Sequence, residues 1–140
     1  MDMGMDENIQ AKMMQIESYR SQLQQYQMQK SQMMLNIQEL VSAKATLEGL
    51  KSAKKGSDIM IPIGGGTFIK GKIEDASAVV TSVGADVAVT KEIEDAEKFI
   101  EMQMNTGEQT VAKIDSYMQA IEDKAASIYN EIESATHQHR

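Results

Sequence analysis

The chain has 140 residues, enough for one ordinary domain, with 4% aromatic residues, 12 methionines and neither tryptophan nor cysteine. This composition suits long helices better than a globule built on large rigid side chains. The lack of cysteine excludes disulfides, thiolate chemistry and Cys-ligated zinc. The net charge of -7 argues against a nucleic-acid binder, because neutralising phosphates takes clustered Lys and Arg.

The first residues, "MDMGMDENIQ", carry acids where a secretory signal would carry basic residues. Nowhere does the chain contain 18 consecutive apolar residues, the length that a membrane helix needs. We therefore expect a soluble cytoplasmic protein that has no membrane partner.

Residues from Asn8 to Lys55 contain no proline, one glycine and many good helix formers, and they predict one long helix. Positions alternately three and four apart are mostly apolar or aromatic, which indicates a heptad seam that packs against another helix. The seam consists of Ile9, Lys12, Ile16, Tyr19, Leu23, Tyr26, Lys30, Met33, Ile37, Leu40, Lys44 and Leu47.

The last third of the chain shows the same periodicity more clearly. Two parallel columns with a seven-residue spacing predict a second long helix in a left-handed supercoil. One column holds Ile93, Ile100, Gly107, Ile114, Ile121 and Ile128, and the other holds Met104, Val111, Met118, Ala125 and Ile132.

Residues 58 to 90 differ from both helical segments because they are rich in Ile and Val that alternate with other residues. Glycine-containing breaks at 64 to 66 and at 84 to 85 divide this stretch. The pattern predicts four short strands in two hairpins.

We therefore predict an α+β fold, in which two hairpins (58–90) are inserted between the helices of a long antiparallel coiled coil (1–57 and 91–140). Residues 8 to 55 carry seven Lys or Arg against three acids, whereas residues 91 to 140 carry five against eleven. These opposite net charges, +4 and -6, favour pairing of the two helices within one chain.

Four short strands have unpaired edges and little cover, so we expect them to join strands of neighbouring subunits. The chain is thus predicted to be an oligomer subunit. The residues expected to mediate this assembly are Ile59, Ile61, Ile63, Phe68, Ile69, Ile73, Val79, Val83, Val87 and Val89.

Both ends of the chain are rich in apolar residues and should meet at the free end of the coiled coil. One interpretation is an adaptable gripping surface, because unbranched methionine fits irregular apolar shapes. The other is that Ile9, Met13, Ile128 and Ile132 complete the seam and that the first residues form a frayed tail. The candidate gripping residues are Met3, Met5, Ile9, Met13, Met14, Ile128, Tyr129 and Ile132.

The stretch "GGGTFIKGKIED" contains the G-x-x-x-x-G-K spacing of a phosphate-binding loop from Gly66 to Lys72. Such a loop opens a helix and ends in Ser or Thr, but here Ile73 follows and the surroundings are typical of strands. Lys70 and Lys72 should share one strand face, away from Ile69 and Ile73. We interpret the glycines as a hairpin turn.

Other candidate chemistry is weak. The "HQH" at 137 to 139 lacks an acid or thiol at a fixed spacing, so it predicts a tail and no metal site. The acids from Glu92 to Glu97 stand where a helix begins and favour its dipole. We expect no active site, no enzyme activity and no cofactor.

The order helix, two hairpins, helix resembles the alpha-class subunit of prefoldin over essentially the whole chain. The resemblance is most specific in the hairpins, where the matching motifs are Pro62-Ile63-Gly64, Phe68-Ile69-Lys70-Gly71 and Val83-Gly84-Ala85 leading to Val87-Ala88-Val89. Two hairpins, in place of one, distinguish the alpha class from the beta class.

This resemblance implies a hexamer of two alpha and four beta subunits, whose hairpins form β-barrels from which the coiled coils extend. It implies an ATP-independent chaperone that holds unfolded polypeptides at the coil tips and passes them to a group II chaperonin. The methionine-rich start agrees with the gripping interpretation. The alternative is a structural coiled-coil adaptor that binds one folded partner.

Overall fold

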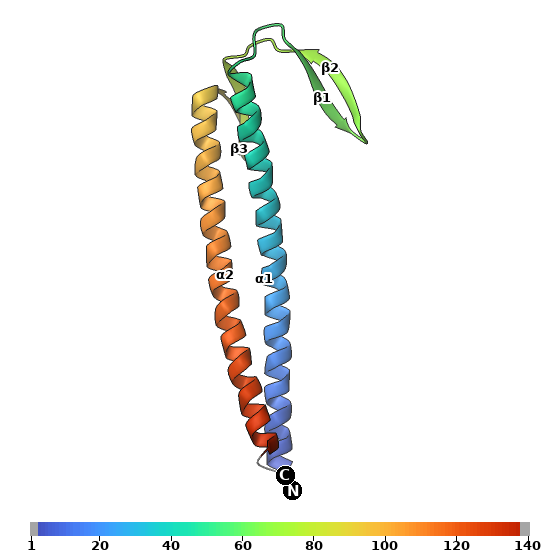
Figure 1. The fold of residues 1–140 in the computed structure, drawn as a ribbon, viewed down its shortest axis with the longest axis vertical. Helices are drawn as coiled ribbons and strands as arrows, with labels where there is room; N and C mark the ends of the chain where they lie inside the picture. Colours follow the sequence, from blue (N-terminus) through green and yellow to red (C-terminus); the bar gives the residue numbers. More distant parts are fainter. Residues whose placement is uncertain (1–2, 138–140) are drawn as a thin grey trace. The chain divides into compact units, whose positions relative to one another are not determined.

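The computed structural model describes the backbone of residues 3–137 and the side chains of residues 7–136. In chain order the elements are α1 (Met3–Leu50), β1 (Asp58–Gly64), β2 (Thr67–Lys72), β3 (Ala78–Gly84), β4 (Val87–Glu92) and α2 (Ile93–His137) (Figure 1). Two long antiparallel helices with two hairpins between them confirm the predicted fold class. No helix in the described part of the chain is long and apolar enough to cross a membrane.

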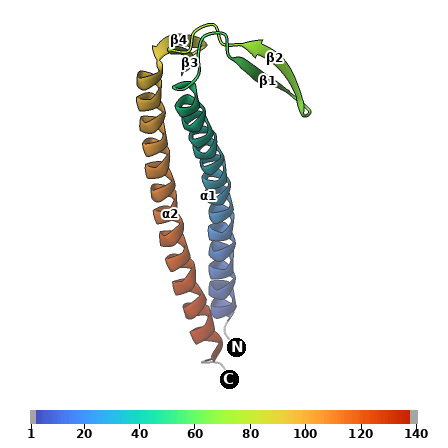
Figure 2. The same ribbon diagram turned by 45° about the horizontal axis from the view of Figure 1, so that its top comes forward.

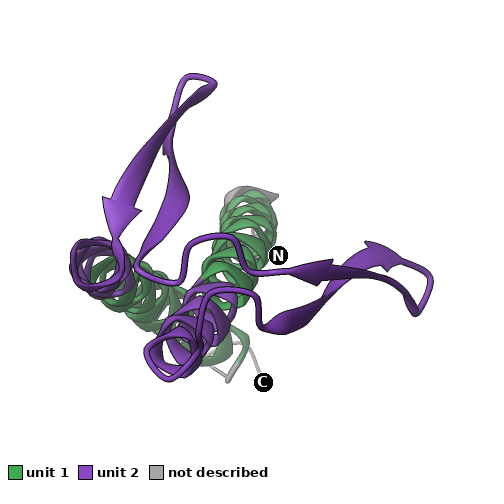
Figure 3. Cartoon of the chain, turned by 90° about the horizontal axis from the view of Figure 1, so that it is seen from above, with its two compact units in different colours: residues 1–36, 107–140 green, residues 37–106 purple. Residues whose placement is uncertain are grey.

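The chain divides into two compact units (Figure 3). Unit 1 joins residues 1–36 to residues 107–140, and unit 2 consists of residues 37–106. In each unit a segment of α1 lies beside an antiparallel segment of α2, as Figures 1 and 2 show. Unit 2 also contains both hairpins.

The predicted seam is the buried side of each helix. All twelve seam positions of α1 from Ile9 to Leu47 are buried or partly buried, whereas most of the residues between them are exposed. Both columns of α2 are likewise covered, with Ile114 only 6% exposed. A seven-residue repeat keeps the same stripe facing the partner helix, which explains why the pattern holds over the whole length.

Ion pairs connect the two helices inside each unit. In every pair the lysine comes from α1 or the turn after it and the carboxylate comes from α2, as the opposite charges of the two segments predicted. The pairs are Lys12–Glu131 (3.4 Å) and Lys30–Asp115 (2.7 Å) in unit 1, and Lys44–Glu101 (3.2 Å) and Lys51–Glu97 (2.9 Å) in unit 2. Lys12, Lys30 and Lys44 occupy seam positions, so the seam of α1 carries positive charge. The acidic residues of the antiparallel α2 neutralise this charge.

A small core lies where α2 begins in unit 2. Leu47, Ile93 and Ala96 are buried together, and Leu50, Val79 and Ile100 pack around them. Val79 belongs to β3, so this cluster fixes the second hairpin to the helices. The backbone N–H of Ile93 also donates to the carbonyl of Ser77 at 3.2 Å.

Each hairpin is a separate two-stranded antiparallel sheet. The first turns at Gly65 and Gly66, which have φ of 58° and 73°, and the second turns at Ala85 and Asp86, with φ of 52° and 60°. Both turns therefore have the double positive φ of a type I′ turn, which suits the twist of paired strands. The glycine-rich segment is a hairpin turn, as predicted.

The first helix ends earlier than predicted, at Leu50 and not at Lys55. The amides of Lys51, Ser52 and Ala53 bond to carbonyls three residues back, and the Ser52 hydroxyl donates to the Gly49 carbonyl. These contacts tighten and close the last turn. Helix propensity alone does not predict an end at Leu50, because the Lys and Ala residues that follow it also favour helix.

Candidate functional site

The first candidate surface is the end of the coiled coil in unit 1. The Lys12–Glu131 ion pair brings the early turns of α1 beside the late turns of α2, so residues from the two ends of the sequence meet here. Ile9, Ile128 and Ile132 are partly buried and complete the seam. Hence these three do what the seam interpretation predicted.

Three other candidates at this end are turned outward. Met13, Met14 and Tyr129 are 58%, 74% and 51% exposed. The structure thus leaves Met13 outside the seam, in contrast to the interpretation that it would finish it. The side chains of Met3 and Met5 lie outside the described residues.

The second candidate surface is formed by the hairpins. Ile59, Ile73 and Val79 are partly buried, and the other predicted assembly residues are exposed, namely Ile61, Ile63, Phe68, Ile69, Val83, Val87 and Val89. Such a set of exposed β-branched and aromatic residues on short, unpaired strands is typical of an interface.

The register divides the first hairpin into two apolar faces. Ile61 is opposite Ile69, so they share one face with Ile59, whereas Phe68 is opposite Pro62 on the other face. A Cβ at Gly71 would lie 3.1 Å from the Ile61 side chain, so the glycine makes room for the isoleucines that cross it. Gly71 therefore has a packing role in the strand.

The segment with phosphate-loop spacing has no feature of a phosphate site. It lies entirely in the first hairpin, and the element that follows Lys72 is strand β3 and not a helix. The Lys72 ammonium is 2.9 Å from Asp58 across the two strands, and both side chains are largely exposed. A helix N-terminus and a hydroxyl are what such a loop needs, and neither is present at this point.

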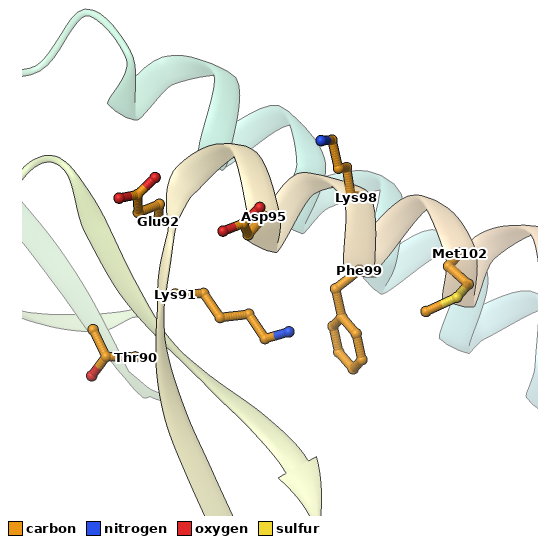
Figure 4. A pocket seen from close by; sticks show the side chains of 7 residues that line it. All are labelled: Thr90, Lys91, Glu92, Asp95, Lys98, Phe99 and Met102. Atoms are coloured by element: carbon orange, nitrogen blue, oxygen red, sulfur yellow. The ribbon is translucent and has the colours of Figure 1, made fainter.

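A shallow pocket of about 640 Å³ lies where β4 joins α2 in unit 2 (Figure 4). The Lys91 ammonium lies 4.5 Å from the centre of the Phe99 ring, a cation–π contact that the sequence did not reveal. The pocket is lined by Thr90, Lys91, Glu92, Asp95, Lys98, Phe99 and Met102. Its charges are mixed in sign, and it holds no arrangement of nucleophile and base.

Among the described side chains there is no group of three or more His, Asp and Glu residues that could hold a metal. His137 and His139 lie outside the residues whose side chains are described. The shifted titrations belong to structural contacts. The neighbouring Glu97 and then Glu48 raise the pKa of Lys51, and hydrogen bonds from Ser77 lower the pKa of Asp75.

The carboxylate of Glu97 forms an ion pair with the ammonium of Lys51. The Glu97 Oε1 atom is buried and lies 2.9 Å from the Lys51 ammonium. The contact is therefore best described as a close ion pair at the edge of the unit 2 core. It ties the end of α1 to the first turns of α2.

The sequence of the chain matches the family model for the prefoldin subunit over residues 19–138. Prefoldin subunit alpha from Methanococcus aeolicus is 33% identical over 134 residues, covering 93% of this chain and 91% of the relative. Prefoldin subunit alpha 1 from Thermococcus kodakarensis is 43% identical over 70 residues, about half of each chain.

Solved structures show the same fold. A chain of the filamentous PFD from Methanocaldococcus jannaschii superposes with a TM-score of 0.58 at 26% identity, covering 86% of this chain and 93% of that one. The prefoldin beta subunit from Thermococcus strain KS-1 superposes with a TM-score of 0.60 at 20% identity, covering 91% of both chains.

Proposed function

Because the chain belongs to the prefoldin family, as an alpha-class subunit, we propose that it holds unfolded polypeptides at the free end of its coiled coil. Membership confirms the expected family, the chaperone role and the absence of an enzyme activity, since prefoldins are a non-enzymatic chaperone family. Where the polypeptide is held, what receives it and which subunits assemble are the substance of the proposal.

The observation that carries the proposal is the exposed apolar group Met13, Met14 and Tyr129 at the end of unit 1. Three large apolar side chains with no packing role in the seam add exposed apolar area where the two helices end. Methionine adapts to many shapes, so such a surface suits clients that share no sequence. Several copies in one assembly would give avidity from contacts that are each modest.

Assembly is the second part of the proposal. The two hairpins present exposed apolar strands whose outer edges have no partner within the described chain. A lone two-stranded hairpin is only marginally stable in water, so pairing with other prefoldin subunits would stabilise it. We take a hexamer of two alpha and four beta subunits with a β-barrel platform as the form to test.

We propose that the chain holds unfolded polypeptides without using ATP and that it passes them to a group II chaperonin. Burial of apolar surface alone can hold a client, and the hairpin that has phosphate-loop spacing lacks the helix such a loop requires. A cytoplasmic location belongs to the same proposal, and a chain without cysteine is compatible with a reducing compartment.

The test of holding replaces exposed residues that have no seam role. Met13→Ser, Met14→Ser and Tyr129→Ser together should leave assembly unchanged and strongly reduce suppression of aggregation of denatured citrate synthase. The control is Met102→Ser, an equally exposed methionine in unit 2, which should retain suppression. Deleting residues 1–14 and 126–140 should abolish suppression, and full activity of that deletion would sink the proposal.

The adaptor alternative makes a different prediction. A structural adaptor would bind one folded partner saturably and would not protect several unrelated denatured proteins. Protection that is equal with and without ATP, and faster transfer when a group II chaperonin is added, would support the chaperone proposal in full.

Assembly is tested separately by mass measurement with and without beta-class subunits. Ile69→Asp or Val87→Asp should release monomer, because each places a charge on an apolar strand face. Ser82→Asp, on an exposed site of β3, is the matched control and should leave the complex intact. Sedimentation that shows intact complexes for Ile69→Asp and Val87→Asp would contradict the assembly proposal.

A further inference from the structure

One stretch of α1 has a chemically unusual outer surface. Between Ser21 and Asn36 the only charged residue is Lys30, which lies in the seam and pairs with Asp115 at 2.7 Å. Every exposed residue of this stretch is uncharged, and we call this surface the neutral face. It consists of Ser21, Gln22, Gln24, Gln25, Gln27, Met28, Gln29, Ser31, Gln32, Met34, Leu35 and Asn36.

The outer surface of a coiled coil usually carries charges, which keep it soluble and support the helix by pairs one turn apart. The facing part of α2 follows that rule. Over the 16 residues from 108 to 123 it exposes five charged side chains, Glu108, Lys113, Asp115, Glu122 and Asp123. The neutral face is therefore a property of α1 alone and not of the coil.

This face also has unused binding capacity. Met28 is 71% exposed and Leu35 is 62% exposed. Gln24, Gln25, Gln29 and Gln32 make no side-chain hydrogen bond within the described part of the chain. An amide side chain both donates and accepts, so each can bond to a backbone N–H or C=O of another chain.

The neutral face is continuous with the proposed holding end. A shallow groove of about 510 Å³ runs along this side of α1, lined by Met14, Glu17, Ser18, Ser21, Gln22 and Gln25. Met14 is the most exposed of the apolar residues named at the holding end, and Ser21, Gln22 and Gln25 belong to the neutral face. A chain held at Met14 can thus extend along the groove.

We propose that the neutral face is a second surface for the unfolded client, on which the polypeptide lies along α1 after it has been caught at the end of the coil. The inference rests on the proposed function. An unfolded segment exposes apolar side chains together with unpaired backbone groups. Methionine and leucine can cover the first, glutamine can satisfy the second, and a surface without charge does not select for the charge of the client.

The observations favour this occupant over a partner helix or a second copy of the coil. A fixed helix needs apolar residues every three or four positions. Met28 and Leu35 are seven positions apart, but no exposed apolar residue of the neutral face lies three or four positions from another, and none lies between Met14 and Met28. A charged partner would meet no opposite charges.

The experiment places charge on the neutral face of the full-length chain, assembled with its partner subunits. Gln25→Glu, Gln29→Glu and Gln32→Glu together change three nearly isosteric side chains on one side of the helix. We expect about fivefold weaker retention of denatured citrate synthase, because each charge must be desolvated against the client. The corresponding triple Gln→Lys variant should weaken retention by about as much, since charge of either sign is unfavourable.

The control adds three negative charges to α2, as Gln103→Glu, Asn105→Asp and Gln109→Glu, whose side chains are exposed. It should change retention by less than about twofold, the effect expected of surface charge remote from the site. If the Glu variant weakens retention while the Lys variant strengthens it, the surface acts by attraction of charge and the proposal is wrong.

A photo-reactive residue at Met28 gives a direct measurement, with one at Ser116 on the outer side of α2 as its control. The client should cross-link at position 28 and not at position 116. Cross-links at position 28 between copies of this chain, or normal client capture without any cross-link there, would overturn the inference. Failure of the proposed function looks different, because the unmodified assembly would then capture no client at all.

Discussion

The two long helices share one geometry and differ in chemistry. α2 has isoleucine at most positions of one buried column, and its exposed side is mainly charged and polar, with Met102, Tyr117 and Tyr129 as its exposed large apolar residues. In α1 three seam positions are lysines, and exposed methionines and leucine occur on the outer side. α1 exposes more large apolar residues than α2 does, namely Met13, Met14, Met28, Met34, Leu35 and Val41, and apolar residues outside the seam remain available for another partner.

The difference also explains how the helices choose each other. Lysine in the seam of α1 would disfavour pairing of two copies of α1, because like charges would meet. Paired with α2, each of these lysines meets a carboxylate. The charges thus select the antiparallel partner, and the isoleucines of α2 supply the burial.

The largest expected effect is the difference in stability between a variant in the seam and a variant on the outer side of α1. Ile114→Ala removes a side chain that is 6% exposed, and it should lower the free energy of unfolding by about 3 kcal/mol through lost burial and an unfilled cavity. Urea denaturation followed by circular dichroism measures this change. Leu35→Ala, at a site that is 62% exposed on α1, should cost less than about 0.5 kcal/mol. Equal losses in the free energy of unfolding would show that Leu35 is packed against other residues even in the single chain.

A smaller effect concerns the charges between the helices. Lys30→Glu should destabilise the chain by about 1 kcal/mol, because Glu would face Asp115 and both groups are partly exposed to solvent. Adding Asp115→Lys to this variant should recover more than half of the loss, as a swapped ion pair. The measurement is urea denaturation at low and high salt, and high salt should reduce the difference.

The control for this pair is Lys113→Glu, a charge reversal at an exposed site of α2 that faces no acid in a described ion pair. Its effect should stay within a few tenths of a kcal/mol. A double variant no more stable than Lys30→Glu alone would mean that the pair does not set the partner choice.

Much of the fold could be predicted from the sequence, because coiled coils and hairpins depend on residue patterns that are local in the chain, such as a heptad repeat or a glycine-containing turn. All twelve seam positions of α1 are covered in the structure, and the turn at Gly65 and Gly66 lies within the predicted break. The individual ion pairs could not be predicted, since Lys30 meets Asp115 only through the long-range register of two helices. The charge totals of the two segments gave the sign of that pairing but not its members.

The candidate surfaces could also be predicted only in part. The sequence pattern located apolar residues at the chain ends and assigned Ile128 and Ile132 to the seam, but it assigned Met13 there too, although Met13 is 58% exposed. One residue changes the helix face by about 100°, and Lys12 occupies the seam position of that turn. The neutral face was missed for another reason. The net charge of +4 over residues 8 to 55 concealed that its charges lie outside Ser21–Asn36 except for Lys30.

The smallest expected effect is a change in the pKa of Lys51, which compares the contact of this lysine with α1 to its contact with α2. Lys51, in the turn after α1, lies 3.3 Å from Glu48 of α1 and 2.9 Å from Glu97 of α2, and Glu97 is the larger cause of its raised pKa. Glu97→Gln should therefore lower the pKa of Lys51 more than Glu48→Gln does. NMR of the Lys51 side chain measures both.

The sign of the associated stability follows from the direction of the shift. A group whose pKa is higher in the folded chain than in the unfolded chain stabilises the fold fully below its unfolded pKa. That contribution is lost as the pH rises through the folded pKa of Lys51, so it is complete at neutral pH and disappears only in the alkaline range. If Glu48→Gln shifts the pKa of Lys51 more than Glu97→Gln does, the contact with Glu48 is the stronger, and the turn after α1 is not held by the charge of α2.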